Sequence, residues 1–246
     1  MKLIFSDEFN YEGAPDPMKW SFDVGNDWHN NEVQYYTDDI KNCYVKDGKL
    51  HIVALNEEKG TRRHTSARIH TYGKFSCTYG KIEMVAKLPQ GIGSWPAFWM
   101  LPDDIREGVD WPLAGEIDIM EYSYGMDPRE MHYSLHSELY NHVIGTQETL
   151  VAKIDGLAED FNKYTCEWEE NKISFYVDDV HQVTFHRDTR INGEPKEQGE
   201  RAWPFDKNYH LILNLAVGGF FAGDKVDDST LPFEYVIDYV KVWQKD

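Results

Sequence analysis

The sequence predicts an all-β protein, a sandwich of antiparallel strands, on two observations. Helical periodicity is almost absent, and only residues 151–163 could form a short helical turn. Instead, short runs with the composition or alternation of strands are separated by turn residues. Residues 172–177 (KISFYV), for example, meet Asp178-Asp179 and continue as 180–185 (VHQVTF), which is the pattern of a hairpin. Because this spacing recurs along the chain, it favours two stacked sheets.

Further expected strands follow the same rule, in which a β-rich run is bounded by a turn or a chain-breaking residue. Residues 49–55 follow Asp47-Gly48, a strong turn pair. Residues 211–217 (LILNLAV) are nearly all apolar, as in a central strand covered on both faces. The other expected strands are 81–88, which alternates and stops at Pro89, and 235–243, which closes the chain.

Length and composition indicate one domain, residues 1–246. The 246 residues fit a single sandwich, and no linker, repeat or low-complexity segment divides them. Three cysteines are too few and too scattered for a disulfide framework or a zinc cluster. Aromatic residues make up 14% of the chain, with 8 Trp and 15 Tyr. Such a surplus is typical either of a cleft that stacks flat ligands or of an aromatic-rich core.

The formal net charge of −18 constrains the partner. Nucleic acids, anionic membranes and sulfated polysaccharides repel such a surface, so we expect a neutral ligand. No apolar run reaches the length of a membrane span, and residues 1–10 lack the apolar stretch of a signal peptide. We expect an extracellular monomer whose signal has been removed. The alternative is an enzyme that works in the cytoplasm.

The segment 115–121 (GEIDIME) carries the strongest chemical signal. In a strand, Glu116 and Asp118 share one face, and the isoleucines between and after them share the other. Glu121 breaks this alternation and would point into the core, where an unpaired charge is costly. A β-bulge near Met120 would return Glu121 to the face of the other two carboxylates. We therefore expect a bulge here.

Three carboxylates on one face repel one another, which raises at least one pKa. Glycoside hydrolysis needs this asymmetry, because one carboxylate attacks while another keeps a proton for the leaving oxygen. From spacing alone, a calcium site or a solvated acidic strand is an equal alternative to catalysis.

Residues 93–102 (GSWPAFWMLP) and GEIDIME resemble the signature of glycoside hydrolase family 16, in the E-x-D-x-x-E form of its laminarinase branch. The resemblance runs nearly end to end, in further blocks at 6–10, 30–37, 65–69, 79–89, 206–219 and 235–243. It implies a jelly-roll β-sandwich (concanavalin-like) of two curved antiparallel sheets with a concave substrate cleft. It also implies endo-acting hydrolysis of β-1,3-glucan with retention of configuration. In these roles Glu116 is the nucleophile, Glu121 the general acid/base, and Asp118 the residue that tunes Glu116.

Other activities stay open. A family relative could act on mixed-linkage β-1,3-1,4-glucan or agarose, although the bulged motif disfavours the first of these. An inactive, lectin-like glucan-binding module on the same fold is a candidate from another class. The intact Glu116, Asp118 and Glu121 argue against it, because a binding module does not need all three.

Tryptophans near the motif are candidates for stacking on sugar rings. Trp95 and Trp99 share one strand face, and core packing is the alternative for both. Trp111 lies in an expected loop just before the motif, where core packing explains it less easily. A polar cluster upstream, which either contacts substrate or borders a loop, comprises Asn30, Asn31, Glu32 and Gln34.

His132, Ser134 and His136 share one face of an expected strand. Two histidines four positions apart on a strand lie about 13 Å apart at ~3.3 Å per residue, too far to share a metal ion. By resemblance, this strand lies beside the catalytic one, and His136 hydrogen-bonds near the nucleophile. The resemblance also places Arg68 and Asn26 at positions that contact sugar.

Asp238 shares its parity with valines of the final expected strand, which puts a carboxylate on an apolar face. Calcium is one solution and hydrogen bonding to nearby backbone is the other. The resemblance also points to calcium, with main-chain oxygens near Glu8 and Gly48 completing the site. We therefore expect a structural calcium and no cofactor in the reaction.

Overall fold

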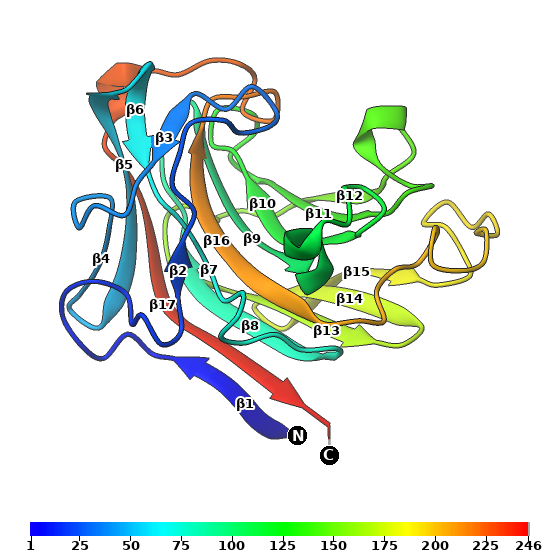
Figure 1. Ribbon diagram of the computed structural model, residues 1–246. Coiled ribbons are helices and arrows are strands. Elements are labelled where there is room, and N and C mark those ends of the chain that lie inside the picture. The colour runs from blue at the N-terminus through cyan, green and yellow to red at the C-terminus, as the bar shows by residue number, and fades with distance from the viewer. Residues whose placement is uncertain (246) are drawn as a thin grey trace.

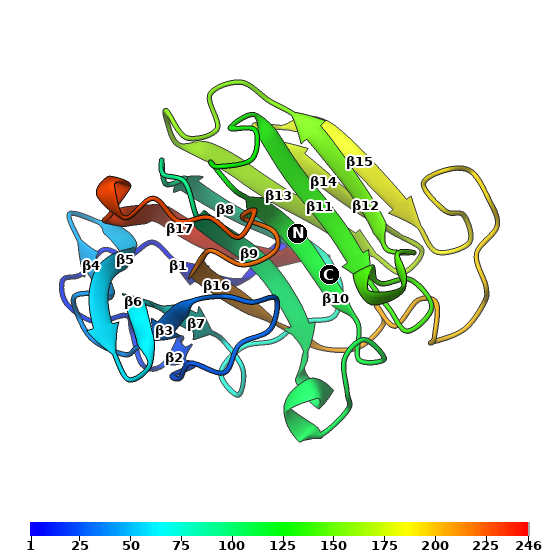
Figure 2. The ribbon, with the colours of Figure 1, turned by 90° about the horizontal axis from the view of Figure 1, so that it is seen from above.

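The computed structural model describes residues 1–245 and consists of two β-sheets that pack face to face (Figure 1, Figure 2). The outer sheet has the order β15-β14-β13-β8-β17-β5-β6-β3, with β1 paired to β17 and β4 to β5. Its strands are β1 (Lys2–Asp7), β3 (Gln34–Tyr36), β4 (Cys43–Lys46), β5 (Lys49–Lys59), β6 (Arg62–Ser66), β8 (Gly80–Lys87), β13 (Asn162–Glu169), β14 (Lys172–Val177), β15 (Val180–His186) and β17 (Phe233–Gln244). Strands β3 and β6 pair in parallel, unlike the other pairs.

The inner sheet has the order β12-β11-β10-β9-β16-β7-β2. Its long strands bend in Figure 1, so that the face turned away from the outer sheet is concave. Its strands are β2 (Ser21–Phe22), β7 (Arg68–His70), β9 (Ser94–Pro102), β10 (Glu116–Tyr122), β11 (Glu130–His136), β12 (Glu148–Lys153) and β16 (Tyr209–Val217). The all-β sandwich predicted from the sequence is therefore confirmed.

Apolar side chains from both sheets fill the space between them. Met84 on β8 and Phe98 on β9 are fully buried in this core. All nine residues of β16 are buried, as expected for a central strand covered on both faces. The rule that alternate side chains face the core thus accounts for most strand positions.

The expected helical turn at residues 151–163 is wrong. Strand β12 ends at Lys153 and β13 begins at Asn162, with turns between them. In residues 1–245 the helices are three short 3₁₀ turns, η1 (Asp103–Glu107), η2 (His142–Ile144) and η3 (Asp228–Thr230). Within the same range, no helix is long and apolar enough to span a membrane.

The parity argument for Asp238 is also wrong. Where β17 pairs with β8, the register shifts between Ile237 and Tyr239, so Asp238 sits at an irregularity. This shift lets Ile237 and Val240 both face the core, although simple alternation would separate them. The Asp238 side chain is 43% exposed and lies 3.7 Å from Lys49 Nζ. Asp238 therefore already has a partner and is not held on an apolar face.

The other parts of the expected calcium site lie nearby. Glu8 forms an ion pair with Lys241 of β17. Gly48 lies in the turn between β4 and β5, with a φ of 71° that suits glycine. Both side-chain carboxylates are thus paired with lysines, and a cation at Asp238 would have to displace Lys49. Calcium binding by Glu8, Gly48 and Asp238 stays a prediction.

Candidate active site

The three carboxylates of GEIDIME lie on the concave face of β10, as predicted. Asp118 is directly opposite Trp99 of β9, and Glu121 is opposite Ala97 of the same strand. The register shifts between Asp118 and Met120, which is the expected bulge. Ile119 and Met120 are consequently both buried in the core, at 1% and 0% exposure. Burial of two consecutive apolar residues keeps Glu121 out of the core and on the cleft side.

Two indoles donate hydrogen bonds to the two glutamates. Trp111 Nε1 donates to Glu116 Oε2 at 2.9 Å, and Trp95 Nε1 donates to Glu121 Oε1 at 3.2 Å. Trp95 also stacks on Phe221, with ring centroids 4.9 Å apart. The structure thus places Trp95 and Trp111 beside the carboxylates, and Trp95 is in addition buried in a small cluster with Ala216 and Ala222.

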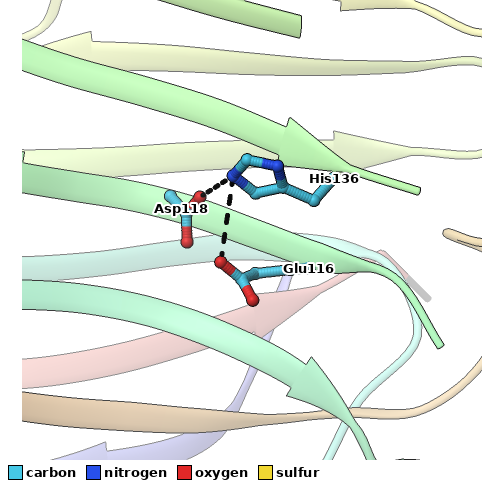
Figure 3. Close-up of side chains that lie close together, drawn as sticks. All are labelled: Glu116, Asp118 and His136. Atoms are coloured by element: carbon cyan, nitrogen blue, oxygen red, sulfur yellow. Dashed lines mark ion pairs between the residues drawn. The ribbon is translucent and has the colours of Figure 1, made fainter. Parts of the chain in front are cut away.

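His136 joins the cluster from β11, the strand on the other side of β10 (Figure 3). Its Nε2 lies 3.3 Å from Asp118 Oδ2 and 3.9 Å from Glu116 Oε1. In residues 1–245, Glu116, Asp118 and His136 form the one cluster whose atoms, within 4.8 Å of one another, could hold a metal ion. Acid–base chemistry accounts for the same cluster without a metal. His136 thus lies beside Glu116, but no hydrogen bond of its ring is present in residues 1–245, and the predicted hydrogen bond near the nucleophile stays a prediction.

Burial and mutual repulsion raise the pKa of all three carboxyl groups. Burial, followed by the charge of Asp118, raises the pKa of Glu116 to about 8. Burial and the charge of Glu116 raise the pKa of Glu121 to about 7. The pKa of Asp118 is raised well above its usual value by burial and by the charge of Glu121. The cluster therefore retains protons near neutral pH, which supplies the acid that glycoside hydrolysis requires.

Trp99, opposite Asp118 on β9, belongs to a separate aromatic group. Arg68 packs its guanidinium over the rings of Trp99 and Trp28, at 4.7 and 5.1 Å from their centroids. Arg68 Nε also lies 3.0 Å from Asp23 Oδ2, so its charge is paired. Arg68 therefore packs against the faces of both indole rings and is paired with Asp23, so it is not a free surface charge.

Asn26 lies at the edge of this group. Its Nδ2 donates to Thr61 Oγ1 at 3.2 Å, and its carbonyl oxygen accepts from Arg62. In the described part of the chain, no hydrogen bond joins Asn26 to the carboxylates. Its predicted contact with sugar stays a prediction.

Sequence reasoning missed a buried hydrogen-bond chain behind Trp99. Trp99 Nε1 donates to Asn214 Oδ1 at 2.7 Å, and Asn214 Nδ2 donates to Tyr36 Oη at 3.0 Å. Tyr36 Oη in turn donates to Glu32 Oε2 at 3.2 Å, so the chain ends on a carboxylate. Asn214 was detectable as the one polar residue in LILNLAV, because a buried amide needs partners.

These features define a class of protein. A concave sheet that presents buried, proton-sharing carboxylates between indole rings is the site of a glycoside hydrolase, because it combines two-carboxylate chemistry with aromatic faces for sugar rings. The chain belongs to glycosyl hydrolases family 16, whose family model matches residues 30–241. This is a family of retaining enzymes, and the resemblance read from the sequence motifs is confirmed.

Known relatives cover nearly the whole chain. It is 44% identical over 247 residues to a β-glucanase of Rhodothermus marinus, covering 99% of this chain and 85% of the relative. It is 38% identical over 256 residues to a glucan endo-1,3-β-glucosidase of Cryptopygus antarcticus, covering 98% and 91%. The X-ray structure of the laminarinase from Rhodothermus marinus superposes with a TM-score of 0.91 at 44% identity, covering 98% of this chain and 96% of that one.

Proposed function

We propose that this enzyme hydrolyses β-1,3-glucan within the chain, with retention of anomeric configuration. The observation that carries the proposal is the bulge in β10, which brings Glu116, Asp118 and Glu121 to one face. Relatives named β-glucanase, glucan endo-1,3-β-glucosidase and laminarinase support the substrate class.

In the proposed mechanism, Glu116 attacks the anomeric carbon and forms a covalent glycosyl-enzyme. Glu121 gives its proton to the leaving oxygen and then activates water for the second step. Asp118, at 2% exposure the most buried of the three, keeps a proton because burial and the charge of Glu121 raise its pKa. A neutral Asp118 removes its repulsion from Glu116, which lowers the pKa of the nucleophile and leaves it ionised.

The substrate is proposed to be neutral, since the chain carries a net charge of −18. Mixed-linkage glucan and agarose are neutral as well, and they are the alternatives within the family. We further propose that the enzyme acts outside the cell as a monomer, and that a calcium ion near Asp238 stabilises the fold without taking part in the reaction.

Product analysis on a panel of polysaccharides tests the proposal. The purified enzyme is incubated with laminarin, lichenan, barley glucan, agarose and carrageenan. Early products from laminarin should span several lengths, because an endo-acting enzyme cuts internal bonds, and their new reducing ends should appear first as the β anomer. Cleavage of agarose alone would reassign the substrate. Binding of laminarin with no cleavage of any polysaccharide would instead favour a binding module.

A further inference from the structure

We propose that His142, on the short turn η2, is a positioning residue that holds Trp111 and His136 against Glu116. The inference rests on the proposed function of Glu116 as nucleophile. It concerns a residue outside β10 and its neighbouring strands, on the loop that joins β11 to β12.

The three rings form a closed group. The ring centroid of His142 lies 4.9 Å from that of Trp111 and 5.2 Å from that of His136. The Trp111 and His136 centroids lie 5.8 Å apart. Two of these rings also reach Glu116, Trp111 by a 2.9 Å hydrogen bond and His136 at 3.9 Å. His142 therefore contacts both aromatic neighbours of the proposed nucleophile without contacting the nucleophile itself.

The backbone of η2 is fixed by Asn141. Its Oδ1 accepts from the backbone N–H groups of Val143 and Ile144, and its Nδ2 donates to the carbonyl oxygens of Ser137 and Glu138. The turn ends at Gly145, with a φ of 68° that favours glycine. One asparagine thus ties η2 to the residues that follow β11 and fixes the backbone beside His142.

A second loop, residues 187–205, supports the first. Arg190 donates to the carbonyl oxygen of Thr146 at 3.0 Å, and the backbone N–H of Glu197 donates to Tyr140 Oη at 3.1 Å. Arg190 and Lys196 both pair with Glu148, at 3.1 and 3.3 Å. The side chains of Lys196 and Glu148 are 1% and 2% exposed. A buried ion pair adds little stability over an apolar pair, so its use here is consistent with fixing loop geometry.

The electrostatic setting of Glu116 gives His142 a measurable effect. Burial and Asp118 raise the pKa of Glu116, whereas the charge of His136 and the hydrogen bond from Trp111 lower it. The titratable groups that face Glu116 are Asp118 and Glu121 on β10, His136 on β11 and the Tyr209 hydroxyl on β16.

Loosening of Trp111 and His136 would weaken the two contacts that lower this pKa, and the pKa of Glu116 would rise. Fewer molecules would then carry an ionised nucleophile at mildly acidic pH. A residue that only stabilised the fold would not move the pH profile in this direction.

The test compares His142→Ala and His142→Phe with the wild type and with Val143→Ala. Val143 lies on the same turn but is 71% exposed, so its removal serves as the matched control. H142A should move the acidic limb of the kcat/KM profile on laminarin upward by about one pH unit, a tenfold loss on that limb. H142F keeps a ring against Trp111 and should restore most of the activity. V143A should match the wild type.

Thermal melts establish that each variant is folded. Should H142A fail to fold, His142→Leu, which keeps apolar volume without a flat ring, should show the same upward shift. A wild-type acidic limb in H142A or H142L, or an H142F variant as impaired as H142A, would overturn the positioning role. A wild type that cleaves no glucan would refute the proposed function itself, which is a distinct outcome.

Discussion

Trp111 Nε1 donates a hydrogen bond to Glu116 Oε2 at 2.9 Å, although Trp111 lies in a loop and Glu116 begins strand β10. The carboxylate thus gains a donor from outside its own sheet. Trp95 donates to Glu121 at 3.2 Å from β9, the neighbouring strand of the same sheet. Each glutamate therefore has its own indole donor.

Replacement of the first indole tests this relationship. Trp111→Phe keeps an aromatic ring but removes the indole N–H. In the wild type, the hydrogen bond from this N–H stabilises the ionised form of Glu116. A hydrogen bond to a charged group contributes about 1.5–3 kcal/mol, so the acidic limb of kcat/KM should move upward by about one pH unit or more. Activity should recover as the pH rises above the new limb.

Trp243→Phe is the matched control, because Trp243 lies on β17 of the outer sheet beside Lys81. Its profile should coincide with that of the wild type. A W111F profile with an unchanged acidic limb, or one displaced to lower pH, would contradict the proposed effect of the indole on Glu116.

Glu32 provides a second test, on the basic side of the profile. Burial and Glu116 raise the pKa of Glu121, and the charge of Glu32 adds to this effect. Glu32 itself accepts hydrogen bonds from Gln34 and Tyr36. Glu32→Gln removes one negative charge, so the pKa of Glu121 should fall and the basic limb of kcat/KM should move to lower pH.

The exposed Glu58→Gln variant controls for the loss of one charge from the whole protein. It should leave the basic limb in place. If E32Q kept the wild-type basic limb, or moved it to higher pH, Glu32 would not act on the proton of Glu121.

The roles of the two glutamates separate by stereochemistry. Glu121→Ala should still react with an aryl glycoside that has a good leaving group, because this step needs little acid help. Azide should then rescue turnover and give the β product. Glu116→Ala cannot form the covalent intermediate, and azide should attack from the vacated face to give the α product.

The anomer of each glycosyl azide, read by NMR, decides between the assignments. Exchange of the two outcomes would reverse the roles of Glu116 and Glu121. Near-native activity of both variants on laminarin and other glucans would rule out hydrolysis by this pair.

Calcium is tested by thermal stability. If Asp238 helps to hold a cation, the metal-free protein should melt at a lower temperature than the protein with added calcium, because a ligand that binds only the folded state stabilises it. Asp238→Asn should lose most of this difference and keep its activity on laminarin. Equal melting temperatures for metal-free and calcium-supplemented wild type would exclude a stabilising site.

The fold class and the central chemistry were accessible from the sequence. Alternation defined most strands, because a residue that faces the core must be apolar whichever strand lies beside it. The bulge in β10 was predictable because an unpaired Glu121 carboxylate is too costly to bury in the core, and only the cleft face of the strand remained. The same logic failed at Asp238. The register of β17 with β8 shifts between Ile237 and Tyr239, so alternation does not predict which face the Asp238 carboxylate occupies. The sequence around the bulge in β10 revealed it only through the cost of burying Glu121, and the sequence around the register shift in β17 carried no such signal.

The sequence by itself determined the all-β pattern, the carboxylate-bearing strand and the neutral class of substrate, because composition and period-2 alternation are local properties. Only the tertiary structure decided that Trp111 donates to Glu116, that Asn214 links Trp99 to Tyr36, and that His142 packs on Trp111 and His136. These contacts join loops and strands distant in the chain. Their geometry depends on sheet curvature and loop packing, which no short segment specifies.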